Sequence, residues 1–184
     1  MSTASPSPLL IRPAAPGDAP QLAEIQTAGG AAAGVGLLPA DYLEHLLHAG
    51  KAHEHLTRPA GGQPAEAVLV AEAEAGRLAG YARVRRGSSI PAYDGELAAL
   101  HVRQPDRGRG AGRQLVQAAA HWLQQAGAAS LMLWAPAGSP ACHFCEHLGA
   151  RLIGRQSSRL DAPGQAAAGE LAYGWPSLAH LLDG

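Results

Sequence analysis

Lysine, phenylalanine and cysteine are among the residues that this 184-residue chain uses least. Lys51 is the only lysine and Phe144 the only phenylalanine, and arginine carries almost all of the positive charge. The formal net charge is −1, so no excess charge of either sign attracts nucleic acid or an anionic membrane surface. Neither is therefore an expected partner.

The sequence gives no indication of a disulfide crosslink between distant parts of the fold or of a targeting segment. Cys142 and Cys145 lie three residues apart, which is too close for a disulfide that joins distant parts of a fold. The chain shows no signal-peptide pattern and no apolar run long enough to span a membrane, so a reducing cytoplasm is the expected location. Its length suits one substantial core, and residues 1–184 are expected to form a single domain.

Apolar periodicity and turn residues predict the elements of the first half of the chain. We expect, in order, a strand at 9–14, a helix at 17–28, a loop at 29–36, a helix at 39–50, an irregular connection at 51–66 and a β-hairpin at 66–86. The glycines of "GGAAAGVG" are the reason for the loop, and Ala75-Gly76-Arg77 is the expected hairpin turn.

The clearest helix pattern lies at 110–126, where apolar residues recur every three or four positions. Around it we expect strands at 95–102 and 130–135, a helix at 139–149 with Ser139 as its N-cap, and last strands near 151–160 and 170–175. The order β-α-α-β-β-β-α-β-α-β-β predicts a mixed α/β sheet in one layer that is covered by helices.

Between the strand at 95–102 and the helix at 110–126, the segment "DRGRGAGRQ" alternates three glycines with Arg109 and Ala111. Glycine is costly in regular structure, so this pattern indicates that a ligand approaches the backbone closely. The bare amides of residues 108–113 at a helix N-terminus, with arginines around them, suit a diphosphate without a metal. An ordinary glycine-rich turn with solvated arginines is the alternative.

Two other phosphate-binding motifs fit this segment poorly. A P-loop requires a lysine and a hydroxyl residue after its last glycine, whereas Arg113 and Gln114 follow Gly112 here. A dinucleotide site requires glycines directly after a strand and an acidic residue about 20 positions further on, and the sequence has neither. Hydrolysis of nucleoside triphosphates is thus excluded, and a dinucleotide is disfavoured.

The segment "GELAALHVRQPDRGRGAGRQLVQAAAHWL", followed by "LMLWAPAGSPACHFCEHLGA", resembles the GCN5-related N-acetyltransferase (GNAT) superfamily in its motifs and in their order. "IRPAAPGDAPQLAEI" and "GLLPADYL" also resemble the N-terminal half of that superfamily. The resemblance implies a single-domain α/β fold with a mixed, mostly antiparallel sheet, helices on both faces, and a cofactor cleft between the fourth and fifth strands. The acetyl-CoA-binding core would be residues 95–150, and 29–38 and 51–66 would be loops on the acceptor side.

By this resemblance the protein is an acyltransferase that uses acetyl-CoA as co-substrate, needs no metal, and acetylates a primary amine of a small molecule, peptide or protein by direct attack. The family often forms homodimers. The glycine loop would bind the pyrophosphate, and the strand would hold pantetheine and polarise the thioester near Val102. The implied cofactor-binding residues are Leu100, His101, Val102, Arg107, Gly108, Arg109, Gly110, Ala111, Gly112, Arg113 and Ser139.

Glu96 is predicted to act as the general base, through a water molecule. It begins the cofactor strand, where many members of the family carry an acid, and a surface carboxylate at a strand end is the alternative. His101 has an ordinary pKa of about 6.5, which suits proton transfer. Strand alternation places its side chain opposite Leu100 and Val102, however, where packing or solvation is expected.

Cys145 stands where the family commonly has a tyrosine that protonates the departing thiolate. A thiol with an ordinary pKa of about 8.5 can donate that proton, and the alternatives are a small core residue with water as the acid. Gly138 and Ser139 also replace the usual asparagine before this helix. A zinc site built on the two cysteines with His143 and His147 is disfavoured, because the two pairs diverge on one helix.

The acceptor pocket carries little sequence signal. The loop expected at 29–36 lacks the aromatic residues of many relatives, so the site is expected to be open, to be mobile, or to suit a bulkier acceptor such as a peptide terminus. Tyr81, Tyr93, Tyr173 and Trp175 are expected either in its wall or in the core. These departures leave a rival hypothesis: a catalytically weakened CoA-binding or regulatory module of the same fold.

Overall fold

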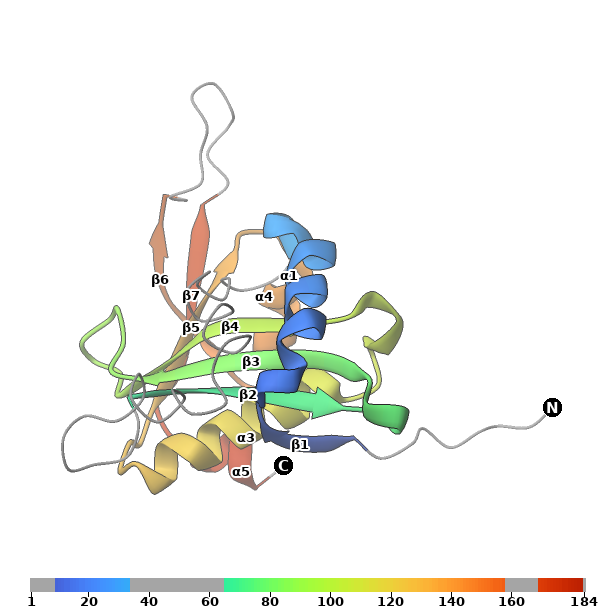
Figure 1. Ribbon diagram of the computed structural model, residues 1–184. Coiled ribbons are helices and arrows are strands. Elements are labelled where there is room, and N and C mark those ends of the chain that lie inside the picture. Colours follow the sequence, from blue (N-terminus) through green and yellow to red (C-terminus); the bar gives the residue numbers. More distant parts are fainter. Residues whose placement is uncertain (1–8, 34–64, 158–168, 184) are drawn as a thin grey trace.

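The computed structural model describes residues 9–33, 65–157 and 169–183. The helix expected at 39–50 and most of the two acceptor-side loops lie outside the described residues. The described part forms one continuous sheet with helices on both faces (Figure 1).

Seven strands of the described residues make up this sheet, in the order β1-β2-β3-β4-β5-β7-β6. Every neighbouring pair is antiparallel except β4 and β5, which are parallel. The mixed, mostly antiparallel sheet is therefore confirmed. The strands are β1 (Leu10–Pro13), β2 (Glu66–Glu72), β3 (Leu78–Arg86), β4 (Gly95–Val102), β5 (Leu131–Pro136), β6 (Arg151–Gln156) and β7 (Glu170–Trp175).

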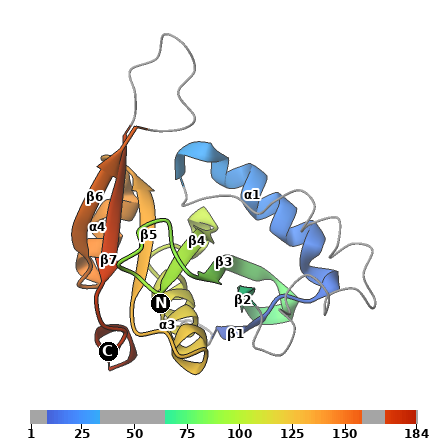
Figure 2. The ribbon, with the colours of Figure 1, turned by 90° about the vertical axis from the view of Figure 1, so that its left-hand side faces the viewer.

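Helices cover the two faces of the sheet unequally (Figure 2). A large apolar cluster joins one face to α3 (Ala111–Gln125), α4 (Pro140–His147) and the short α5 (Ala179–Leu182). The apolar stripe of α3, which includes the fully buried Leu115 and Leu123, lies in this cluster, as its periodicity predicts. A smaller cluster packs α1 (Ala19–Ala33) on the other face.

Asp18 closes a short 3₁₀ turn, Pro16–Asp18, directly before α1. Its buried carboxylate accepts hydrogen bonds from both terminal nitrogens of Arg12, at 2.7 and 2.9 Å, and from the Ala15 amide at 2.7 Å. These contacts hold the pKa of Asp18 below its ordinary value, with the Arg12 hydrogen bonds as the main cause. The start of α1 is thereby tied to β1.

Two helical segments differ from the sequence prediction. Residues 29–33 continue α1 instead of opening a loop, so the loop prediction was wrong there. Alanine is the strongest helix former, and the three alanines after Gly29 and Gly30 extend the helical hydrogen bonding past the glycines. The single-turn helix α5 was not predicted; it forms because Leu178 and Leu181 bury their side chains in the core three residues apart.

Candidate active site

The parallel pairing of β4 and β5 is very short. Gly95 pairs with Leu131 and Glu96 with Met132, and no pairing between the two strands follows in the described residues. From Leu133 to Pro136, β5 continues beside β7 alone. The two strands therefore diverge after Glu96, and each leaves an unpaired backbone edge along the gap. This gap lies where the sequence predicted a cofactor cleft, between the fourth and fifth strands.

The register of β4 on β3 determines which backbone groups of β4 face this gap. The Arg103 amide donates to the Ala79 carbonyl of β3 at 2.8 Å, and His101 lies opposite Tyr81. Because hydrogen-bonding residues alternate along an antiparallel strand, Leu100 and Val102 direct their amide and carbonyl groups away from β3. The Arg107 side chain donates to the Val102 carbonyl at 3.2 Å, as this geometry allows. Leu100 and Val102 thus offer backbone partners to an extended ligand.

The glycine loop lies at the end of β4, where the chain turns into α3, and it is the second part of the site. A 3₁₀ turn, Gln104–Asp106, precedes the glycines, and Gly108 and Gly110 adopt positive φ angles of 74° and 87°. Within the described residues, none of the amides of 108–113 donates a hydrogen bond, and the first bonded amide is that of Gln114. These unpartnered amides form the positive N-terminal end of α3, which attracts an anion.

The glycine at 112 serves a different purpose. A Cβ atom built there would lie 3.2 Å from the Phe144 ring of α4, so a larger residue would push α4 away from α3. Gly112 thus allows α4 to close the cavity beside the glycine loop.

The open edge of β4, the glycine loop and α4 enclose one cavity of about 550 Å³. This is a typical size for a site that takes a small molecule or cofactor. Its wall includes eight of the predicted cofactor-binding residues: Leu100, Val102, Arg107, Gly108, Gly110, Ala111, Gly112 and Arg113. The cavity therefore gathers most of the residues that the sequence pattern singled out.

Three residues predicted to bind the cofactor do not line this cavity. His101 is buried on the opposite face of the sheet, where its ring stacks on Tyr81 with ring centres 5.1 Å apart. Arg109 is 58% exposed and lies 3.8 Å from the Asp106 carboxylate. Ser139 takes the N-cap position of α4, but its hydroxyl makes no capping bond and lies 3.9 Å from the Cys142 sulfur.

Asp106 also lines the cavity, although sequence reasoning did not assign it a role. Both of its carboxylate oxygens accept hydrogen bonds from Arg77, at 2.6 and 2.8 Å, and the carboxylate is buried. Arg77 thereby holds the pKa of Asp106 below its ordinary value. The two residues are 29 positions apart, so only the folded chain shows this pairing.

The other residues missed by sequence reasoning come from α4 and from Leu148, the residue directly after it. Ala141, Phe144 and Leu148 line the cavity and recur at helical spacing. That spacing identifies one face of a helix, but it does not distinguish a face against a ligand from a face against the core.

Glu96 lies where β4 and β5 separate, on the face opposite Leu97, and only 7% of it is exposed. Its Oε2 accepts hydrogen bonds from Arg85 at 2.8 Å and from the Ser89 amide at 2.7 Å. Among the described residues, Oε1 has no hydrogen-bonding partner. Glu96 is therefore an oriented carboxylate, and not a free surface residue at a strand end.

Cys145 is completely buried in the core beneath α4 and does not line the cavity. Burial raises the pKa of its thiol to about 12, so the thiol stays protonated near neutral pH. Its position fits the alternative of a small core residue. The described cavity wall offers no tyrosine, serine or threonine hydroxyl in its place.

A model of the acetyltransferase (GNAT) family matches residues 37–150, which is more than half of the chain. The chain therefore belongs to the GNAT acetyltransferase family, and it is an acyltransferase. An uncharacterized N-acetyltransferase of Bacillus subtilis strain 168, YuaI, is 28% identical over 148 residues, which cover 79% of this chain and 80% of that protein.

Solved structures support the fold. A nourseothricin acetyltransferase is 27% identical, with a TM-score of 0.54; the match covers 62% of this chain and 66% of that one, just under two thirds. A variant of the spermidine N-acetyltransferase SpeG from Vibrio cholerae has a TM-score of 0.68 at 17% identity and 95% and 96% coverage. The yncA structure from Salmonella typhimurium, solved with its cofactor acetyl-CoA, has a TM-score of 0.67 at 19% identity and 94% and 95% coverage.

Within residues 9–33, 65–157 and 169–183, no helix is both long and apolar enough to cross a bilayer. In the same part of the chain, no three histidine, cysteine or acidic side chains gather as they would around a metal ion.

Proposed function

We propose that this enzyme transfers an acetyl group from acetyl-CoA to a primary amine. One observation carries the proposal: the unpartnered amides of 108–113 and the open backbone edge at Leu100 and Val102 line the same cavity. Acetyl-CoA joins a diphosphate to an extended pantetheine arm that ends in a thioester. The amides suit the diphosphate, and the strand edge suits the amide groups of the arm.

In this arrangement the chain orients the donor instead of forming a covalent intermediate. The loop at 108–113 anchors the diphosphate, and the Leu100 and Val102 backbone aligns pantetheine parallel to β4. A backbone amide of β4 in the gap polarises the thioester carbonyl and stabilises the charge that develops on its oxygen. The amine nitrogen then attacks the carbonyl carbon, the new C–N bond forms, and the C–S bond breaks.

Glu96 is the proposed base for this step. Because Arg85 and the Ser89 amide hold Oε2, Oε1 can accept, through a water molecule, the proton that the substrate ammonium must lose before its nitrogen attacks. Water is the proposed acid for the departing thiolate, since Cys145 is buried and does not face the cavity.

The test is to measure thiol release from acetyl-CoA with a panel of small amines and peptides, beside calorimetric binding of CoA. We expect turnover with at least one amine. Glu96→Gln should reduce kcat by about 100-fold or more without changing the Kd of CoA, because only the proton acceptor is removed. Glu74→Gln, on the exposed β2–β3 turn, is the matched control and should leave both values unchanged.

The same measurements separate the enzyme from a weakened CoA-binding or regulatory module. CoA binding without turnover of any amine, with no effect of Glu96→Gln, would favour that module. Absence of CoA binding would reject both functions.

A further inference from the structure

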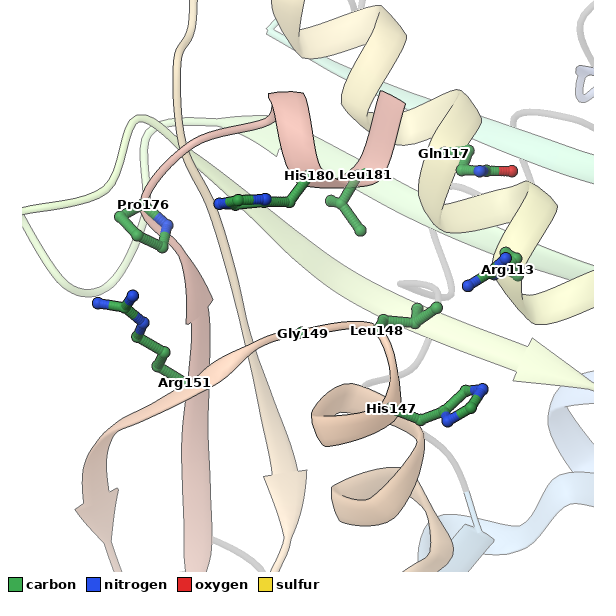
Figure 3. Close-up of a pocket in the computed structure, with 9 residues that line it drawn as sticks. All are labelled: Arg113, Gln117, His147, Leu148, Gly149, Arg151, Pro176, His180 and Leu181. Carbon is green, nitrogen blue, oxygen red and sulfur yellow. The ribbon is translucent and has the colours of Figure 1, made fainter. Parts of the chain in front are cut away.

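The cavity beside the glycine loop lies on the face of the sheet that α3 and α4 cover. A second cavity of about 450 Å³ lies next to it, between α3, the end of α4, the start of β6 and α5 (Figure 3). Arg113, His147 and Leu148 line both cavities, so the second one extends the site already described. Glu96 lies on the opposite face of the sheet and depends on a different set of contacts, because Leu97 points to the α3 side.

The loop between β3 and β4, residues 87–94, supports Glu96 on that opposite face. Ser89 of this loop uses its two polar groups in two directions. Its amide donates to Glu96 Oε2 at 2.7 Å, and its hydroxyl accepts a hydrogen bond from Trp134 Nε1 at 2.8 Å. Trp134 belongs to β5, on the other side of the gap from β4. Ser89 therefore connects the proposed base to the strand across the gap.

Trp134 is held in place by the sheet around it. Its neighbour Leu133 lies in the large core cluster, so strand alternation places the Trp134 ring on the same face as Glu96. Trp134 pairs with Ala172 of β7, and a Cβ atom built at Gly154 of β6 would lie 3.9 Å from Cη2 of the ring. The six-membered ring thus reaches over small residues of the neighbouring strands, and the N–H of the indole points to the loop.

Ser89 has little other support from the backbone. Among the described residues, neither its amide nor its carbonyl makes a hydrogen bond to another backbone group. The hydroxyl of Ser89 also lies 3.8 Å from the sulfur of Met132, the β5 residue that pairs with Glu96. The contacts of the Ser89 side chain with β5 therefore fix the loop at the point where its amide meets the carboxylate. Because Ser89 is exposed, water competes for its hydroxyl, and the bond contributes more to orientation than to stability.

We propose that Trp134 is a positioning residue for the acetyl transfer. Through its hydrogen bond to Ser89, it keeps the Ser89 amide on Oε2 of Glu96, so that Oε1 is presented to the substrate in one orientation. This inference rests on the proposed function, in which Glu96 is the base. A base must lie within hydrogen-bonding reach of the proton that it removes, and a small displacement lowers the rate without weakening binding. Trp134 thus supports kcat and leaves the affinity for CoA unchanged.

The experiment compares steady-state kinetics and calorimetric CoA binding in variants of the full chain, with an amine that the wild type acetylates. Trp134→Phe keeps an aromatic ring and removes the N–H donor. It should lower kcat by about five- to tenfold, while the KM of the amine and the Kd of CoA change by less than about twofold. Ser89→Ala removes the acceptor of the same bond and should give the same loss, and the two changes combined should cost no more than either alone.

Two further variants serve as controls. Ser89→Thr keeps the hydroxyl and should retain the kcat of the wild type. Trp122→Phe makes the same exchange on α3, where Trp122 packs against the core cluster on the other face of the sheet, and it should leave kcat unchanged. Thermal denaturation of each variant shows that it is folded.

The decisive measurement repeats Trp134→Phe in the Glu96→Gln background. There the remaining kcat should fall by less than about twofold, because no base is left to position. An equal loss of kcat in both backgrounds would show that Trp134 acts independently of Glu96, and it would overturn this inference. A raised KM of the amine with unchanged kcat would assign the ring to acceptor binding and would overturn it as well.

Failure of the proposed function gives a different result. If the wild type acetylated no amine, or if Glu96→Gln alone kept the kcat of the wild type, the proposed base would be wrong and this inference would fall with it. A wild type that depends on Glu96, together with a Trp134→Phe variant of unchanged kcat, would overturn the role of Trp134 alone.

Discussion

Arg77, on the turn between β2 and β3, donates hydrogen bonds to both carboxylate oxygens of Asp106, at 2.6 and 2.8 Å, and Asp106 lines the cavity of about 550 Å³ beside the glycine loop. The contact places a buried negative charge beside the proposed diphosphate site and neutralises it there. A carboxylate without this partner would repel a phosphate.

This pairing predicts the behaviour of a double-mutant cycle. Arg77→Met should weaken CoA binding by about tenfold, because the charge of Asp106 is then only partly compensated by Arg109 at 3.8 Å. Asp106→Asn in the Arg77→Met background should restore most of the affinity, since it removes the repulsion. Calorimetric Kd values for the four proteins give the coupling free energy. Additive effects of the two substitutions would contradict the role of Arg77.

Backbone conformation in the glycine loop gives a second prediction. Gly110 has a φ of 87°, and Gly127, at the other end of α3, has a φ of 81°. Alanine at either position should cost about 1–2 kcal/mol of unfolding free energy, because both φ values disfavour a side chain. Only Gly110→Ala should also weaken CoA binding, since it alters the loop that presents the amides. Chemical denaturation and calorimetry measure the two effects, and an equal loss of affinity in Gly127→Ala would refute the specific role of the loop.

The role of Cys145 is separable from that of Glu96. Because its side chain is fully buried and outside the cavity, Cys145→Ala should lower the melting temperature while kcat changes by less than about twofold. Thermal denaturation and steady-state kinetics test this. A loss of kcat by a factor of about ten or more in a folded variant would instead support the thiol as the acid.

The Arg12–Asp18 pair gives a prediction for stability as a function of pH. The folded state holds the pKa of Asp18 below its ordinary value of about 3.9, so the carboxylate stabilises the fold fully above that pH. The contribution should then be lost as the pH falls from about 4 through the lower folded-state pKa.

Urea unfolding of the wild type and of Asp18→Asn across this range measures that contribution. The difference in unfolding free energy should be constant from about pH 7 to pH 5 and should shrink below about pH 4. If the difference in unfolding free energy did not vary with pH, the charge of the Asp18 carboxylate would not contribute to the stability of the fold.

Local sequence pattern predicted most of the architecture. The strand at 95–102 and the hairpin at 66–86 occur at the expected residues, because alternation and turn composition are local properties. The glycine loop was recognisable for the same reason. By contrast, the continuation of α1 to Ala33 follows from alanine propensity in a stretch whose glycines indicate a loop.

The parts of the site that sequence did not predict depend on contacts between distant segments. Arg77 reaches Asp106, and Arg85 reaches Glu96, only through the pairing of β3 with its neighbours and the turn beyond it. The second cavity likewise needs α5, whose single turn carries too little periodicity to identify. The periodicity of apolar residues indicates which residues share a face of a helix or strand, and only tertiary packing determines whether that face contacts the core, a ligand or solvent.

The short contact between β4 and β5 has a mechanical consequence for the whole molecule. Only two residue pairs join the four-stranded half of the described sheet to the three-stranded half, so the twist between the halves has little backbone restraint beyond those pairs. A ligand that forms hydrogen bonds with the open edge of β4 and packs against α4 would connect the two halves of the sheet. Occupancy of the cleft therefore stiffens the fold as a whole, and amide exchange should slow in strands far from the ligand as well as near it.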